Sequence, residues 1–148
     1  MKRIIGLIPS RLGSKRLPGK ALADILGLPV IIHVAKRSLL SKKLSKLIVC
    51  TDSKEIYDQC KIHDVEAIIT DNYYKNGTER IASVAKDQDF DFAIDIQGDE
   101  PLVDPSHIDI VAECISNNNK NEDIIIPTLD VPFSVPETIV RVQSSLSG

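Results

Sequence analysis

The sequence predicts an α/β fold in which a mostly parallel sheet carries helices on both faces. Short, nearly continuous apolar runs alternate along the chain with segments whose apolar residues recur at helical spacing. Continuous apolar runs are typical of strands buried on both faces, as in parallel sheets. Alternation of this kind favours crossover connections between parallel strands. The length of 148 residues suits one domain with a substantial core, and we expect residues 1–148 to form it.

Six apolar runs are the predicted strands. In chain order they cover residues 4–8, 47–50, 66–70, 90–96, 124–127 and 139–142. Between the first two runs, Pro29 opens a segment with apolar residues at helical spacing, and proline suits the first position of a helix. Lys42 and Lys43 are cations of the kind that favour a helix C-terminus. A helix is therefore expected from Pro29 to near these two lysines.

Three further helices are expected from capping signals. Asp52 with Glu55 three residues later resembles a capping box at the start of a helix. Thr78 can cap the next helix. Asp104 followed by Pro105 combines an N-cap residue with a proline at the first helical position. Each signal follows a predicted strand, as the alternation of strands and helices requires.

The composition argues against several classes of protein. A net charge of -3 argues against a general nucleic-acid binder. No apolar run approaches the ~20 residues that a membrane helix needs, and the apolar run after Arg3 is too short for a signal peptide. The three cysteines are scattered without a CxxC pair, which indicates small core residues and fits a reducing cytosol. We therefore expect a cytoplasmic protein that binds neither nucleic acid nor membranes.

A basic loop follows the first predicted strand. Residues 8–20 read IPSRLGSKRLPGK and contain the cations Arg11, Lys15, Arg16 and Lys20. Glycine lets backbone N–H groups approach a phosphate closely, and lysine and arginine neutralise its charge. The P-loop pattern is absent, because five residues separate Gly13 from Gly19 and Ala21 follows Lys20. The loop is therefore expected to bind a polyphosphate mainly through its side-chain cations.

Polar residues follow two other predicted strands. Asp52 follows the second strand, and residues 97–99 follow the fourth. The carboxyl ends of parallel strands share one edge of the sheet, where ligands of such folds bind. Asp99 is thus expected close to the basic loop. Mg²⁺ takes only one or two protein carboxylates beside phosphate oxygens, so Asp99 is a candidate magnesium ligand.

Three motifs together resemble a known family. The basic loop, NGTERIA at residues 76–82 and DIQGDEP at residues 95–101 are similar in sequence, order and spacing to the cytidylyltransferases that activate 3-deoxy-manno-octulosonate (Kdo). The resemblance implies a Rossmann-like nucleotide-binding domain of the nucleotide-diphospho-sugar transferase type. It also implies transfer of CMP from CTP to the anomeric hydroxyl of Kdo, with Mg²⁺ as cofactor, releasing pyrophosphate and serving lipopolysaccharide synthesis. A homodimer is the state implied for the full-length family.

The resemblance also implies roles for individual residues. Arg11, Lys20 and Asp99 would be catalytic, the first two holding the CTP phosphates and Asp99 the metal. The substrate-binding residues would be Ser10, Gly13, Arg16, Asp52, Thr78, Arg80 and Gln97. This division of roles suits the chemistry, because attack on an α-phosphate needs mainly positioning and charge neutralisation.

The chain departs from the family in two respects. Tyr74 and Asn76 stand in the loop where family members often carry histidine and serine, and we interpret the aromatic residue as loop packing. The chain is also short for the family, so a second metal-binding aspartate, much of the sugar pocket and much of the dimer contact are expected to be missing. Two alternatives therefore stay open: activation of a related acid sugar, such as an 8-amino Kdo analogue or a nonulosonate, and a truncated, non-catalytic nucleotide-binding module.

Overall fold

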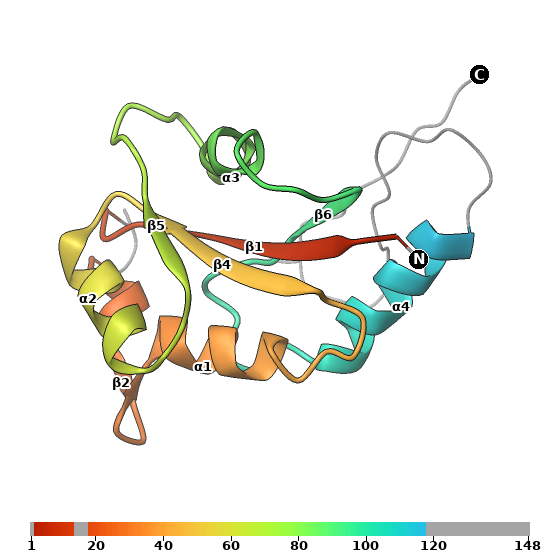
Figure 1. The fold of residues 1–148 in the computed structure, drawn as a ribbon. Coiled ribbons are helices and arrows are strands. Elements are labelled where there is room, and N and C mark those ends of the chain that lie inside the picture. The colour runs from red at the N-terminus through yellow and green to blue at the C-terminus, as the bar shows by residue number, and fades with distance from the viewer. Residues whose placement is uncertain (1, 14–17, 118–148) are drawn as a thin grey trace, which may run out of the picture. The chain divides into compact units, whose positions relative to one another are not determined.

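The computed structural model describes residues 2–13 and 18–117, and its centre is a parallel sheet. The four strands of this sheet lie in the order β5-β4-β1-β6 (Figure 1). Their bounds are β1 Ile4–Ser10, β4 Lys46–Thr51, β5 Ala67–Ile69 and β6 Phe92–Asp95. Every pairing between them is parallel. The predicted α/β class is therefore confirmed, and so are the first four strands to within a few residues; the predicted strands at 124–127 and 139–142 lie outside the described residues.

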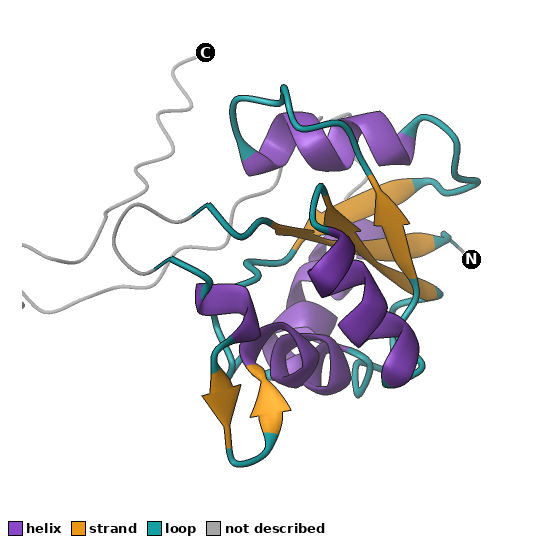
Figure 2. Ribbon diagram, turned by 90° about the vertical axis from the view of Figure 1, so that its left-hand side faces the viewer, coloured by secondary structure: helices purple, strands orange, loops and turns teal. Residues whose placement is uncertain are grey.

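Helices cover both faces of the sheet. Their bounds are α1 Val30–Ser38, α2 Lys54–Ile62, α3 Gly77–Ala85 and α4 Pro105–Asn117. Figure 1 shows α3 on one face and the other three helices on the opposite face. A short 3-10 helix, η1 (Lys20–Leu22), and a small antiparallel pair, β2 (Asp24–Ile25) and β3 (Leu28–Pro29), lie next to α1, on the side of that helix layer in Figure 2. No helix within the described residues is long and apolar enough to cross a membrane.

Alternate side chains of the central strands face opposite layers, so the fold has two apolar cores. The core under α3 contains Ile5, Leu7, Ile48, Cys50, Ile81 and Val84. The core on the other face is larger and includes Ile8, Val30, Ile31, Val34, Val49, Ile56 and Cys60. Side chains of a strand alternate between its two faces. β1 therefore supplies both cores, and its near-continuous burial explains its apolar sequence.

Two predicted helix caps are wrong by one or two residues. Ser53 caps α2, because its Oγ accepts a hydrogen bond from the backbone N–H of Ile56 at 3.2 Å, so Asp52 lies just outside the helix. Asn76 caps α3, where its Oδ1 accepts from the N–H of Glu79 at 2.8 Å. Thr78 is therefore an exposed residue of the first turn. Both Asp52 and Ser53 are good N-cap residues, so the sequence alone could not choose between them.

Helix α1 differs from its predicted bounds, whereas α4 begins where predicted. Pro29 is the N-cap of α1 rather than its first residue, and the helix ends at Ser38, earlier than predicted. The backbone N–H groups of Lys42 and Lys43 instead donate to the Asp109 carboxylate, at 3.0 and 3.2 Å. A tertiary contact thus takes the place of helical backbone hydrogen bonds at these two lysines. The predicted start of α4 is confirmed, because the Asp104 carboxylate accepts from the backbone N–H of Ser106 at 2.8 Å.

Candidate functional site

A pocket of about 510 Å³ lies where β1 and β6 end. It is lined by Pro9, Ser10, Arg11, Lys20, Ala21, Tyr74, Lys75, Asn76, Gly77, Arg80, Gln97, Gly98 and Asp99. These residues come from the end of β1 and the residue after it, from η1, from the segment before α3 and the start of that helix, and from the loop after β6. The four strands run in one direction, so their carboxyl ends share one edge of the sheet (Figure 1). The pocket lies at this edge. This is the edge at which parallel α/β sheets bind ligands.

Two glycines allow the segments on either side of the pocket to pack closely against Pro9. A Cβ atom on Gly98 would stand 2.6 Å from the carbonyl oxygen of Pro9, and a Cβ on Gly77 would stand 2.9 Å from its Cγ. Real Cβ contacts are essentially never shorter than 3.0 Å. Only glycine therefore lets the loop after β6 and the first residue of α3 pack against the end of β1. These contacts bring Gln97 and Asp99 to the basic residues that follow β1.

The predicted phosphate-binding lysine and the predicted metal ligand form an ion pair. Lys20 Nζ lies 2.9 Å from Asp99 Oδ2, and the two side chains are 39% and 57% exposed. Gly19 sets the direction of this segment, because its φ of 71° is left-handed and it caps η1, which begins at Lys20. An ion pair this exposed contributes little to stability. Both groups can therefore be redirected towards a ligand at small cost.

Arg80 and Asp52 form a second ion pair that is much more buried. Arg80 Nη2 lies 2.8 Å from Asp52 Oδ2, and the two side chains are only 4% and 20% exposed. Arg80 also donates from Nη1 to the Thr70 hydroxyl and, at 3.3 Å, to the Asp71 carbonyl oxygen. Arg80 reaches the pocket wall, whereas the described lining does not include Asp52. In this structure the Asp52 carboxylate bonds to another side chain, and its substrate contact stays a prediction.

The pocket gathers most of the predicted site residues. Those in its lining are Ser10, Arg11, Lys20, Arg80, Gln97 and Asp99. Gly13 and Thr78 are exposed residues outside the described lining. Arg16 and its neighbour Lys15 lie outside the described residues. The roles of all these residues stay predictions, since no ligand marks the pocket.

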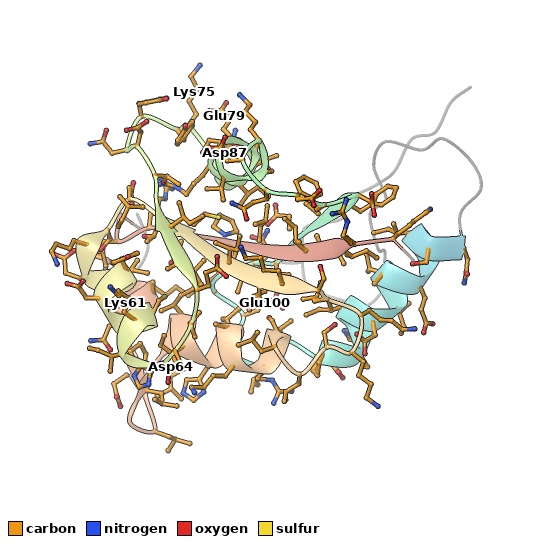
Figure 3. All side chains as sticks on the ribbon, in the orientation of Figure 1. Lys61, Asp64, Lys75, Glu79, Asp87 and Glu100 are labelled. Atoms are coloured by element: carbon orange, nitrogen blue, oxygen red, sulfur yellow. The ribbon has the colours of Figure 1, made fainter. Side chains whose placement is uncertain are left out.

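The segment before α3 contributes residues that the sequence analysis did not place in the site. Tyr74, Lys75 and Asn76 line the pocket. Figure 3 shows the Lys75 side chain directed away from the sheet, on the α3 side. The Tyr74 ring pairs with that of Tyr73, with centroids 4.5 Å apart, so the interpretation as packing describes only part of its environment. Their place in the chain could have indicated this, because the segment leads from the end of a strand into the start of a helix.

Hydrogen bonding makes the two adjacent tyrosines chemically different. Their hydroxyl oxygens lie 3.3 Å apart. This contact raises the pKa of Tyr73 to about 12. Hydrogen bonding with Ser83, and then with Tyr73, lowers the pKa of Tyr74. The more acidic hydroxyl therefore belongs to Tyr74, which is the one of these two tyrosines that lines the pocket.

The single carboxylate of the described pocket lining suits a cation shared with a ligand rather than one held by protein alone. Asp99 is the only carboxylate in the described lining. No group of three or more His, Cys, Asp or Glu residues could hold a metal in the part of the chain that the structure describes. Mg²⁺ commonly takes one or two carboxylates and completes its shell with water and phosphate oxygens. Asp99 suits that arrangement, in which the phosphates of a nucleotide supply further ligands.

Sequence comparison connects the chain with named enzymes. A cytidylyltransferase family profile matches residues 5–145. A 3-deoxy-manno-octulosonate cytidylyltransferase of Trichlorobacter lovleyi is 43% identical over 118 residues, which make up 78% of this chain and 46% of that protein. The enzyme of the same name from Chlorobium limicola is 40% identical over 129 residues, or 86% of this chain and 52% of that protein. The chain thus spans about half the length of these curated relatives.

Solved structures give the same result. A CMP:2-keto-3-deoxy-manno-octonic acid synthetase complexed with CTP superposes with a TM-score of 0.74 at 34% identity, over 78% of this chain and 48% of that one. A cytidylyltransferase from Leptospira borgpetersenii shares the fold, with a TM-score of 0.70 at 23% identity over 80% of this chain and 51% of that one. The family profile covers nearly the whole chain, and the fold and pocket described above agree with it. The chain belongs to the cytidylyltransferase family.

Proposed function

We propose that the pocket binds CTP and that the chain acts in the transfer of CMP to the anomeric hydroxyl of Kdo, giving CMP-Kdo and pyrophosphate. The observation that carries the proposal is the meeting of Arg11, Lys20 and Asp99 in one pocket at the carboxyl edge of the sheet. The names of the relatives support CTP as the nucleotide and Kdo as the acceptor. Lipopolysaccharide synthesis in the cytoplasm, and a homodimeric enzyme, belong to the same proposal.

The proposed chemistry needs cations more than a protein nucleophile. The sugar hydroxyl attacks the α-phosphorus of CTP and loses its proton, a new P–O bond forms, and the bond to the β-phosphate oxygen breaks as pyrophosphate leaves. Arg11 and Lys20 would bind the triphosphate and neutralise charge on the leaving pyrophosphate. Asp99 would hold Mg²⁺, which would supply further neutralisation of that charge. The amide of Gln97 would orient the nucleotide or the sugar at the same edge.

The remaining predicted contacts belong to the same proposal. Ser10 lies in the pocket lining at the end of β1 and would add a hydroxyl contact to the substrate. Gly13 and Arg16 would extend the phosphate-binding surface along the basic loop, and Thr78 would contribute from the exposed first turn of α3. A related acid sugar is the second candidate acceptor, favoured by Tyr74 and Asn76 in the loop where family members often carry other residues.

Calorimetric titration with CTP in the presence of Mg²⁺ tests the binding step. Lys20→Ala should weaken CTP binding about tenfold, because a charge-assisted hydrogen bond contributes about 1.5–3 kcal/mol and the lost ion pair offsets about 0.2–1 kcal/mol of it. Lys54→Ala is the matched control, since Lys54 also forms an exposed ion pair, 2.7 Å from Asp58, outside the pocket. Absence of CTP binding by the wild-type chain at millimolar concentration would sink the proposal.

A second experiment separates turnover from binding. Pyrophosphate release is measured with CTP, Mg²⁺ and a panel of acid sugars that includes Kdo, an 8-amino Kdo analogue and a nonulosonate. Release with Kdo supports the proposed reaction, and preferential release with another sugar supports the second acceptor. Magnesium-dependent CTP binding without release from any sugar would instead identify this chain as a nucleotide-binding module.

A further inference from the structure

The buried pair of Asp52 and Arg80 is the strongest polar feature that the proposed chemistry leaves without a role. We propose that both are positioning residues: Asp52 fixes Arg80, and Arg80 fixes the segment 71–77 as one wall of the pocket. Neither residue then needs to contact the nucleotide through its charge. The affinity part of this inference rests on the proposed function, whereas the part that concerns the segment does not.

Arg80 links three segments of the chain: the residue after β4, the residues after β5, and α3. Its guanidinium bonds to Asp52 after β4, to the Thr70 hydroxyl after β5, and to the Asp71 carbonyl, while its own backbone belongs to α3. Guanidinium has five donors in a fixed plane and can serve several acceptors at once. The residues between Asp71 and α3 include the three that line the pocket from this side. Loss of the guanidinium contacts should therefore loosen that wall.

Asp52 is itself held on both sides. The carbonyl oxygen of Thr51 accepts from the backbone N–H of Thr70 at 2.8 Å, which joins the ends of β4 and β5. The backbone N–H of Ser53 donates to Thr51 Oγ1 at 3.1 Å, and Ser53 caps α2. The carboxylate of Asp52 is thus presented to Arg80 by a rigid backbone. Arg80 is 4% exposed, so removal of its counter-charge leaves a cation that is largely shielded from water.

Tyrosine fluorescence offers a direct readout of this segment. The chain has three tyrosines and no tryptophan, and two of the tyrosines, Tyr73 and Tyr74, lie in the segment that Arg80 holds. A Tyr57→Phe background leaves only these two as emitters. In that background, Asp52→Asn should increase the quenching of tyrosine emission by acrylamide. The same variant should weaken CTP binding about tenfold, because a loosened wall must be ordered again when CTP binds and this ordering costs affinity.

Two further variants separate positioning from general destabilisation. Arg80→Lys keeps the charge but lacks the planar set of donors, so it should act like Asp52→Asn. Thr70→Val removes one acceptor and leaves the ion pair, so it should give a smaller change in the same direction and covers the case in which the other variants do not fold. Circular dichroism and measurement well below the unfolding midpoint confirm that the compared proteins are folded.

Asp58→Asn is the matched control, because it removes the same charge from an exposed pair with Lys54. Quenching and CTP affinity in Asp52→Asn that both equal this control would overturn the inference. Lost CTP affinity with unchanged quenching would also overturn it, since Asp52 would then act on the nucleotide directly. If the wild-type chain binds no CTP, the proposed function fails, and the quenching comparison alone decides the role of the pair.

Discussion

Replacing Asp99 with asparagine should change CTP affinity in opposite directions with and without Mg²⁺. In the pocket, Lys20 Nζ lies 2.9 Å from Asp99 Oδ2. A triphosphate that binds without metal must draw Lys20 away from this carboxylate and must also approach its negative charge. Asparagine removes both obstacles, so metal-free CTP should bind more tightly to Asp99→Asn than to the wild type.

The exposure of the pair sets the size of the effect. The two side chains are 39% and 57% exposed, and pairs of this kind contribute about 0.2–1 kcal/mol. This energy corresponds to metal-free binding that is roughly 1.4- to 5-fold tighter in the variant. With Mg²⁺, the carboxylate would instead supply the proposed metal ligand, which the neutral amide would replace poorly. The gain in affinity that Mg²⁺ gives the wild type should therefore be largely lost in the variant.

Titration calorimetry in EDTA and then in excess Mg²⁺ measures both effects on the same protein. Asp58→Asn serves as the control, because it breaks an exposed ion pair of similar geometry outside the pocket and should change neither affinity. Weaker binding of metal-free CTP to Asp99→Asn would contradict the competition between phosphate and Asp99 for Lys20. An undiminished gain from Mg²⁺ would show that Asp99 is not a metal ligand.

Two further predictions concern the scaffold of the site. Gly98→Ala should lower the free energy of unfolding by about 1–3 kcal/mol in urea titration, because its Cβ would meet the Pro9 carbonyl oxygen at 2.6 Å. Gly13→Ala, with nothing within 4 Å, should be close to neutral, and equal costs at the two positions would refute the packing argument. A thiol reagent at mildly alkaline pH should modify only the exposed Cys114 of the native protein. Burial raises the pKa of Cys50 to about 12 and that of Cys60 to about 11, so both thiols stay protonated until unfolding, and early reaction of a second thiol would count against the buried positions.

The sheet could be predicted from sequence because burial on both faces leaves a direct trace in composition. β1 and β4 are apolar along nearly their whole length, and both are buried in the structure. The pair β2 and β3 was missed, because its turn residues are Leu26 and Gly27 rather than a typical Asn-Gly or Asp-Gly. Both turn residues adopt positive φ, at 52° and 87°, which leucine rarely does. No local signal in the sequence marks such a turn.

That the candidate residues lie at one edge of the sheet could also be predicted, but the bonds between them could not. Parallel strands place the residues after β1 and β6 at one edge of the sheet, and this rule predicted that Lys20 and Asp99 lie close together. Their direct contact, across 79 residues of sequence, depends on the close approach of Gly98 to Pro9. The partner of Arg80 depends likewise on how α3 lies against the loops after β4 and β5. These are properties of packing, and one sequence does not encode them as a pattern.

The two ion pairs of the site differ in burial, and this difference separates their roles. Lys20 and Asp99 are exposed enough that water and ions compensate each charge when the pair opens, so both can turn to a ligand and its metal at small cost. Arg80 and Asp52 cannot separate cheaply, because the guanidinium is almost fully enclosed and water cannot replace its partner. In the proposed binding of CTP, the two pairs would therefore have different tasks. The buried pair fixes the wall, and the exposed pair supplies charges that are free to rearrange when the ligand enters.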